Sequence, residues 1–296
     1  MQYTAFLNSG GRILHDAFLF RDPSTAAVFL DTPAQGSSDL VAHLKRYRLR
    51  AAVSVDDVTP EWRVWAALPP DSSASNQGGN TSISAPNPQL HSDPRLQVRT
   101  RDANEQAHVF SCSQPYRACL PCAQALGQRA VMPASWLPEV AAVPASVPYD
   151  VHRFRLGVGE TAAELGGEVA LECNLDGLHG VSFTKGCYIG QELTSRTHFR
   201  GVIRKRVMPF TLPSAPVGAS RPQVARGDAV FDAASGAPLG RVLAFHPGAA
   251  CGLALLRLGE PQQRHRVACA GEQAEVEVHT PAWWPSSWLA AAAGQT

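Results

Sequence analysis

The sequence lacks a hydrophobic run long enough to cross a membrane. A spanning helix needs about 20 predominantly apolar residues, and the most apolar terminal stretch, 287–294, is alanine-rich and far shorter. The N-terminus shows neither the hydrophobic region of a secretory signal nor an Arg- and Ser-rich amphipathic presequence. We therefore expect no membrane insertion, and we expect any targeting segment to be missing from this chain.

Charge is also scarce, and neither sign dominates. Charged residues make up 17% of the 296 residues, compared with roughly 25% in an average soluble protein. The 26 lysines and arginines nearly balance the 25 aspartates and glutamates, which leaves a formal net charge of +1. Because no net field attracts polyanions, we expect no nucleic-acid partner.

Several motifs of enzymes and metalloproteins are missing as well. There is no phosphate-binding loop, dinucleotide-binding glycine pattern or ordered Ser-His-Asp set, and the ten histidines have no metal-ligand spacing. The seven cysteines are scattered and odd in number, which favours a reducing compartment over a disulfide framework. Cys119 and Cys122 form a C-x-x-C, but no second ligand pair accompanies them. We expect no stably bound metal in the isolated chain.

The apolar residues that are present predict two domains with many turns. The chain is 45% hydrophobic, contains 24 glycines and 23 prolines, and has the length of about two average domains. After Val202, short apolar runs alternate with Gly, Pro and Ser turns, which predicts an antiparallel β-barrel over 203–285 followed by a tail at 286–296. The predicted strands are 207–212, 229–231, 240–245, 252–258 and 274–279.

Residues 1–200 predict a first domain of the α+β class. Two apolar runs flank a turn at Gly10 and Gly11, and Asp16 interrupts the second run. A helix is predicted to follow, with Ser38 as its N-cap. The segment 71–94, with six serines, three asparagines and three prolines, predicts a disordered insertion, and 102–148 predicts a variable one.

A cysteine lies in an unusual glycine-containing stretch. Gly186 immediately precedes Cys187, Lys185 lies two positions before it, and Gly190 lies three positions after it. Glycine permits tight turns and close approach of another molecule. A nearby ammonium group, or the N-terminus of a helix starting at Gln191, would favour the reactive thiolate. The alternative is a small buried hydrophobic residue in a turn, which is common for a free cysteine.

The run 181–192 reads VSFTKGCYIGQE and continues as LTSRTH at 193–198 and GVIRKR at 201–206. This run resembles the signature of the folate-binding YgfZ family, relatives of the glycine-cleavage T-protein (GcvT). The continuation resembles the iron–sulfur cluster assembly branch of that family. Supporting matches are FLN at 6–8, DPR at 93–95, LECN at 171–174 and PAWWP at 281–285. The resemblance covers about two thirds of the chain.

The resemblance implies a GcvT/YgfZ-like folate-binding domain, here truncated at its N-terminus, followed by the barrel. It implies a factor acting late in the maturation of mitochondrial 4Fe–4S proteins, in the mitochondrial matrix, together with an A-type scaffold protein. We expect an assembly factor with a transferase-like fold rather than an enzyme. The alternative is a folate-dependent one-carbon transferase of the aminomethyl type.

The resemblance also assigns roles to the residues of the signature. Cys187 would be the functional thiol and a transient cluster ligand shared with the partner, because thiolate is a soft ligand suited to iron–sulfur centres. The rest of the motif would shape this loop: Lys185, Gly186, Tyr188, Gly190, Gln191 and Glu192.

A tetrahydrofolate-like ligand is the second implied feature. Glu172 and Asn174 could hydrogen-bond a pterin-like ring, although local turn bonding explains them equally well. Arg196 and Arg204 would suit the carboxylates of a folate tail or of an acidic partner protein. Strand alternation would place Arg204 on the same face as Arg206. An exposed strand with solubilising charge is the equal alternative.

Overall fold

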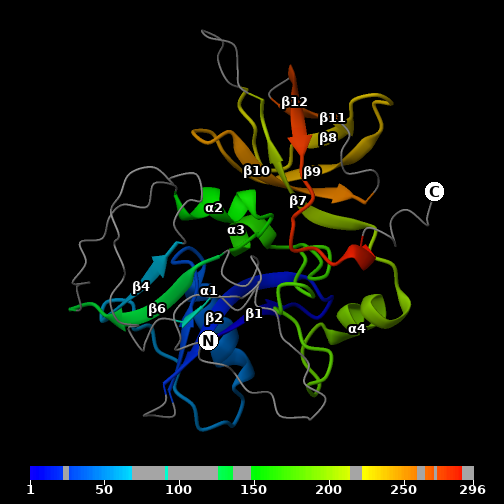
Figure 1. Cartoon of the computed structure of the whole chain (residues 1–296). Helices are drawn as coiled ribbons and strands as arrows, with labels where there is room; N and C mark the ends of the chain where they lie inside the picture. Colours follow the sequence, from blue (N-terminus) through cyan, green and yellow to red (C-terminus); the bar gives the residue numbers. More distant parts are fainter. Residues whose placement is uncertain are drawn as a thin grey trace, which may run out of the picture.

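The computed structural model describes residues 1–22, 27–68, 91–92, 126–135, 148–213, 222–258, 264–269 and 272–288. Two β-sheets form the lower part of Figure 1, and a β-barrel forms the upper part. No helix in these described ranges is long and apolar enough to cross a membrane.

The first sheet is an antiparallel meander of β1 (Gln2–Leu7), β2 (Ile13–Arg21) and β3 (Val28–Asp31). The turn between β1 and β2 closes through Gly11, whose φ of 75° favours glycine. The backbone N–H of Arg12 donates to the side-chain oxygen of Asn8 at 3.0 Å, which fixes the turn. This hairpin matches the one predicted from sequence.

The second sheet joins strands that lie far apart in the sequence. Its order is β4 (Trp62–Ala67), β6 (Gln128–Pro133) and β5 (His91–Ser92), and all its pairs are antiparallel. Strand β6 lies within the segment 102–148. The rest of that segment up to 125 and from 136 to 147, and the insertion at 71–94 apart from β5, lie outside the described residues.

Four helices lie in the described part of the first domain. They are α1 (Ser37–Tyr47), α2 (Tyr149–Arg155), α3 (Ala162–Leu165) and α4 (Gln191–Arg200). The predicted N-cap at Ser38 is wrong, because the helix already starts at Ser37 and Gly36, with φ of 90°, occupies the cap position. Helix α4 starts at Gln191, where the sequence places a helix start.

The second unit is a closed antiparallel barrel in the order β10-β7-β12-β11-β8-β9. Its strands are β7 (Lys205–Thr211), β8 (Ala229–Asp232), β9 (Pro238–His246), β10 (Cys251–Arg257), β11 (Arg264–Cys269) and β12 (Glu272–Val278). The fold class predicted from sequence is confirmed. The sequence missed β11 because this strand opens with Arg-His-Arg, which conceals its apolar alternation.

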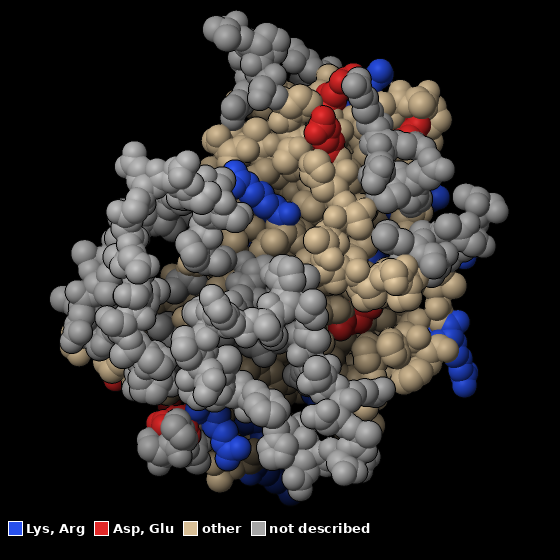
Figure 2. All heavy atoms as spheres, viewed as in Figure 1, with Lys and Arg blue, Asp and Glu red and all other residues tan. Residues whose placement is uncertain are grey.

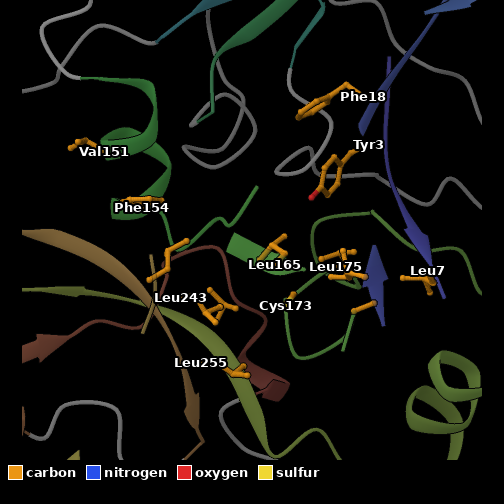
Figure 3. Packing of buried hydrophobic residues seen from close by; sticks show 14 of the residues in the cluster. Tyr3, Leu7, Phe18, Val151, Phe154, Leu165, Cys173, Leu175, Leu243 and Leu255 are labelled. Carbon is orange, nitrogen blue, oxygen red and sulfur yellow. The ribbon is translucent and has the colours of Figure 1, made fainter. Parts of the chain in front are cut away.

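Strand β10 is buried on both of its faces. Leu253 and Leu255 pack with residues of the first domain, whereas Ala254 and Leu256 fill the barrel interior. Side chains alternate between faces along a strand, so the apolar run in β10 supplies both cores at once. Figure 3 shows Leu243 and Leu255 of the barrel next to Leu165 and Cys173. The two domains therefore share the cluster that contains Leu253 and Leu255, and the barrel interior forms a second cluster.

Candidate functional site

The cysteine of the signature lies in an open loop before α4. Cys187 is exposed, whereas Cys173 and Cys251 are buried. The interpretation of Cys187 as a buried hydrophobic residue is therefore wrong. The Lys185 Nζ lies 4.7 Å from the centroid of the Tyr188 ring, so its ammonium is held over an aromatic face within the same loop.

Two glycines attach this loop to the β1–β2 turn. Gly190 has φ of 79°, and a Cβ added there would lie 2.6 Å from the backbone oxygen of Asn8. A Cβ on Gly11 would lie 2.7 Å from the Cβ of Leu193, the third residue of α4. In contrast, a Cβ on Gly186 would meet nothing within 4 Å. Gly190 is thus required by packing within the chain, whereas the space at Gly186 is open.

Hydrogen bonds close the loop onto the start of α4. The backbone N–H of Tyr188 donates to Oε1 of Gln191, and the N–H of Gln191 donates back to the carbonyl of Tyr188, both at 3.2 Å. Glu192 points to solvent and pairs weakly with Arg196 at 3.9 Å. Burial raises the pKa of the Tyr188 hydroxyl. The two hydrogen bonds between Tyr188 and Gln191 fix the loop that presents the thiol.

The residues predicted for folate are spread over different surroundings. Glu172 is half-buried, and burial raises the pKa of its carboxyl despite the neighbouring charges of Lys205 and Arg12. Arg196 and Arg204 are both exposed, on α4 and just before β7. The described contacts do not bring these side chains together at one site.

Asn174 is fully buried and has φ of 64°. Its Nδ2 donates to the carbonyl of Val207 at 2.8 Å, and its Oδ1 accepts from Arg206 at 3.3 Å. Both bonds reach β7, so Asn174 connects the first domain to the barrel. The expectation that Arg204 and Arg206 share a ligand-facing surface is wrong, because Arg206 is 2% exposed and its guanidinium pairs with Asp176.

Sequence reasoning missed a buried polar network inside the first domain. Its centre is Arg129, which pairs with Asp31, donates to the Tyr149 hydroxyl at 2.6 Å and to Glu160 at 3.2 Å, and lies over the Phe18 ring. Ninety-eight positions separate Arg129 from Asp31, so no local pattern joins them. The network orients charged groups that would be costly to bury singly.

Further charged groups extend this buried region. Asp16 accepts from the Tyr3 hydroxyl at 3.0 Å and from the backbone N–H of Thr161 at 2.9 Å. Arg153 donates to both carboxylate oxygens of Glu164. Burial opposes the charge of Arg153, but the hydrogen bond and charge of Glu164 still raise the pKa of this guanidinium. The only sequence signal was Asp16, the charge interrupting the apolar run of β2.

Comparison with known proteins identifies the family. Residues 204–286 match the family described as the CAF17 C-terminal beta-barrel domain. The human mitochondrial iron–sulfur cluster assembly factor IBA57 is 34% identical over 300 residues, which cover 96% of this chain and 72% of the human protein. The chain belongs to the IBA57 family. The mouse member is 32% identical over 293 residues, covering 96% of this chain and 73% of the mouse protein.

Fungal members of the IBA57 family are considerably longer than this chain. The Mycosarcoma maydis homologue is 33% identical over 231 residues, covering 74% of this chain and 49% of that protein. The chain thus spans about half the length of the fungal relatives that it matches. The fungal and mammalian names alike describe a mitochondrial iron–sulfur cluster assembly factor.

A solved structure confirms the predicted fold. The glycine cleavage system aminomethyltransferase T from Bartonella henselae aligns with a TM-score of 0.56 over 96% of this chain and 76% of that protein, at 14% identity. At this identity the likeness concerns the fold alone. The resemblance predicted from the run at 181–206 is therefore confirmed for both the family and the architecture.

Proposed function

We propose that this chain acts in iron–sulfur cluster assembly through the exposed thiol of Cys187. The observation that carries the proposal is the presentation of this thiol. Its loop is closed by Gln191 and anchored by Gly190, yet the thiol itself faces open space. A fixed, accessible soft ligand is suited to transient contact with an iron–sulfur cluster.

The cluster is cargo rather than a resident group in this proposal. Iron–sulfur clusters are usually held by four cysteine thiolates, and within the described ranges no group of three or more His, Cys, Asp or Glu side chains could hold a metal. The partner must therefore supply the remaining ligands. We propose an A-type scaffold protein for this role and Cys187 as the thiolate added by this chain.

We further propose that the chain supports the maturation of 4Fe–4S proteins in the mitochondrial matrix. The names of the human and mouse relatives support the compartment and the process. The one-carbon transferase is the weaker candidate. The aminomethyltransferase shares the fold at 14% identity, whereas the human assembly factor shares 34% of aligned positions.

A tetrahydrofolate-like ligand is implied by the fold, but the residues predicted to hold it do not fit it as a set. The side chain of Asn174 is engaged with β7, and Arg196 and Arg204 are exposed surface groups. No step of the proposed mechanism passes through folate. Folate binding by this chain stays a prediction, which titration of the purified protein with tetrahydrofolate would test.

Complementation would test the proposed function. Cells depleted of their own family member would receive the chain with a mitochondrial presequence, as wild type, Cys187→Ser or Cys122→Ser. We expect all three proteins to accumulate equally, but only wild type and Cys122→Ser to restore aconitase activity and protein lipoylation. The 2Fe–2S enzymes should be unaffected throughout. Full rescue by Cys187→Ser would overturn the role of the thiol.

A further inference from the structure

Four exposed cations lie within six residues at the end of α1. They are Lys45, Arg46, Arg48 and Arg50, and residues 40–55 contain no aspartate or glutamate. This stretch therefore carries a formal charge of +4, whereas the whole chain carries +1. Cations in the last turn of a helix complement its dipole. That accounts for Lys45 and Arg46, but Arg48 and Arg50 follow the helix.

A leucine projects from the middle of this basic group. Leu49 lies between Arg48 and Arg50, is 83% exposed, and has φ of 48°. This left-handed backbone favours glycine or asparagine and is unfavourable for a bulky side chain. The turn therefore does not require a leucine, and the core gains nothing from one that lies outside it. A residue that breaks a local rule without a structural gain is typical of a functional position.

Hydrogen bonds place a second exposed apolar side chain on the same turn. The backbone N–H of Ala51 donates to the carbonyl of Arg48 at 2.8 Å, and Nη1 of Arg48 donates to the carbonyl of Val53 at 3.1 Å. Val53 is 57% exposed. The Arg48 guanidinium thus closes a turn that carries both Leu49 and Val53.

Tyr47 attaches this turn to the first sheet. Its half-exposed ring lies 4.7 Å from the His43 ring, and His43 meets the ring of Phe6 on β1 edge-on at 6.2 Å. The Cζ of Arg46 lies 5.7 Å from the centroid of the Tyr47 ring. A tyrosine combines an apolar ring with a polar tip, which suits a boundary between an apolar layer and water.

The turn lies at the end of the molecule opposite the barrel. In Figure 1, α1 and the chain that follows it occupy the lower end of the first domain, and the barrel forms the upper end. Figure 2 shows basic side chains gathered at this lower end. The barrel therefore does not obstruct the approach of an extended flat surface to the turn.

We propose that the end of α1 binds an anionic lipid surface. We call it the basic turn and define it as Lys45, Arg46, Arg48, Leu49, Arg50 and Val53. The cations contact headgroup phosphates, and the two apolar side chains enter the layer beneath them. A lipid layer supplies negative charge and an apolar phase just below it, whereas nucleic acid offers a projecting leucine no such phase. This adsorption needs no spanning helix, and the inference does not depend on the proposed role of Cys187.

Sedimentation of the purified chain with vesicles would test the proposal. We expect binding to vesicles of phosphatidylcholine and phosphatidylglycerol, weakened by added salt, and little binding to phosphatidylcholine alone. Arg46→Gln/Arg50→Gln should weaken binding about 25-fold, because each cation near such a surface contributes about fivefold. Leu49→Asn should weaken it about tenfold through the lost apolar contact. This variant should stay folded, because asparagine tolerates a left-handed backbone.

A matched control lies on the barrel. Arg257→Gln/Arg266→Gln also removes two exposed cations and should bind anionic vesicles as wild type does, as should Cys187→Ser. Failure of wild type to bind anionic vesicles, or equal binding by wild type and the basic turn variants, would overturn the proposal. A polyglutamate peptide that binds as tightly as the vesicles, with no loss in Leu49→Asn, would assign the turn to an acidic protein instead.

Discussion

Arg206 of β7 and Asp176 of the first domain form a two-point ion pair across the domain junction. The guanidinium nitrogens donate to the two carboxylate oxygens at 3.0 and 2.9 Å, and Arg206 is 2% exposed. It also donates to the carbonyl of Leu171 at 3.1 Å and to Oδ1 of Asn174 at 3.3 Å, and its Cζ lies 3.2 Å from the centroid of the Trp288 ring. Trp288 follows the barrel, so this one guanidinium joins three parts of the chain.

Removing the carboxylate should destabilise the whole chain. Asp176→Ala leaves the buried guanidinium without its charge partner, and such losses typically cost about 3–5 kcal/mol. Urea unfolding followed by tryptophan fluorescence would measure the loss. Glu192→Ala is the control, because its ion pair with Arg196 is exposed and worth about 0–1 kcal/mol. Equal stability of the two variants would contradict the assigned role of Arg206.

The two glycines of the signature loop should respond differently to alanine. Gly190→Ala forces a non-glycine residue to φ of 79° and places its Cβ 2.6 Å from the Asn8 oxygen, so we expect a loss of about 1–3 kcal/mol. Gly186→Ala meets nothing within 4 Å and should leave the unfolding free energy nearly unchanged. Thermal and urea unfolding would compare them. A larger loss for Gly186→Ala would disprove the anchoring described for Gly190.

Thiol labelling should single out Cys187. Burial raises the pKa values of Cys173 and Cys251, so both stay neutral and shielded at pH 8, whereas Cys187 is exposed. The measurement would use a chain in which Cys112, Cys119, Cys122 and Cys269 are serines, with iodoacetamide and mass spectrometry. We expect one label in the folded protein and three in 8 M urea. Early modification of either buried thiol would argue against the shared core.

His265 should make the protein less stable in mild acid. Burial lowers the pKa of this imidazole below its ordinary value of 6.5, with Asp232 opposing the shift. Below pH 6.5 the unfolded chain therefore binds more protons than the folded one, and the free energy of unfolding falls as the pH drops. His265→Gln should flatten this decline between pH 7 and 5. Parallel pH profiles of the variant and wild type would refute the assignment.

The sequence by itself was sufficient for features that depend on local pattern. Short apolar runs between Gly, Pro and Ser turns predicted five of the six barrel strands, because such runs bounded by turn residues are typical of short strands. The glycines around Cys187 predicted a tight turn and left a reactive thiol and a buried one as alternatives, and the start of α4 at Gln191 followed from the same run. These features depend on neighbours within a few positions.

Only the tertiary structure decided which charged residues face inward. Arg204 and Arg206 look equivalent in the sequence, yet one is exposed and the other is buried against Asp176, thirty positions away. The ion pair of Arg129 with Asp31 spans ninety-eight positions and joins β6 of the second sheet to β3 of the first. A charged side chain is stable in a core only where a partner is already placed. Chain topology sets that placement, and the local sequence does not record it.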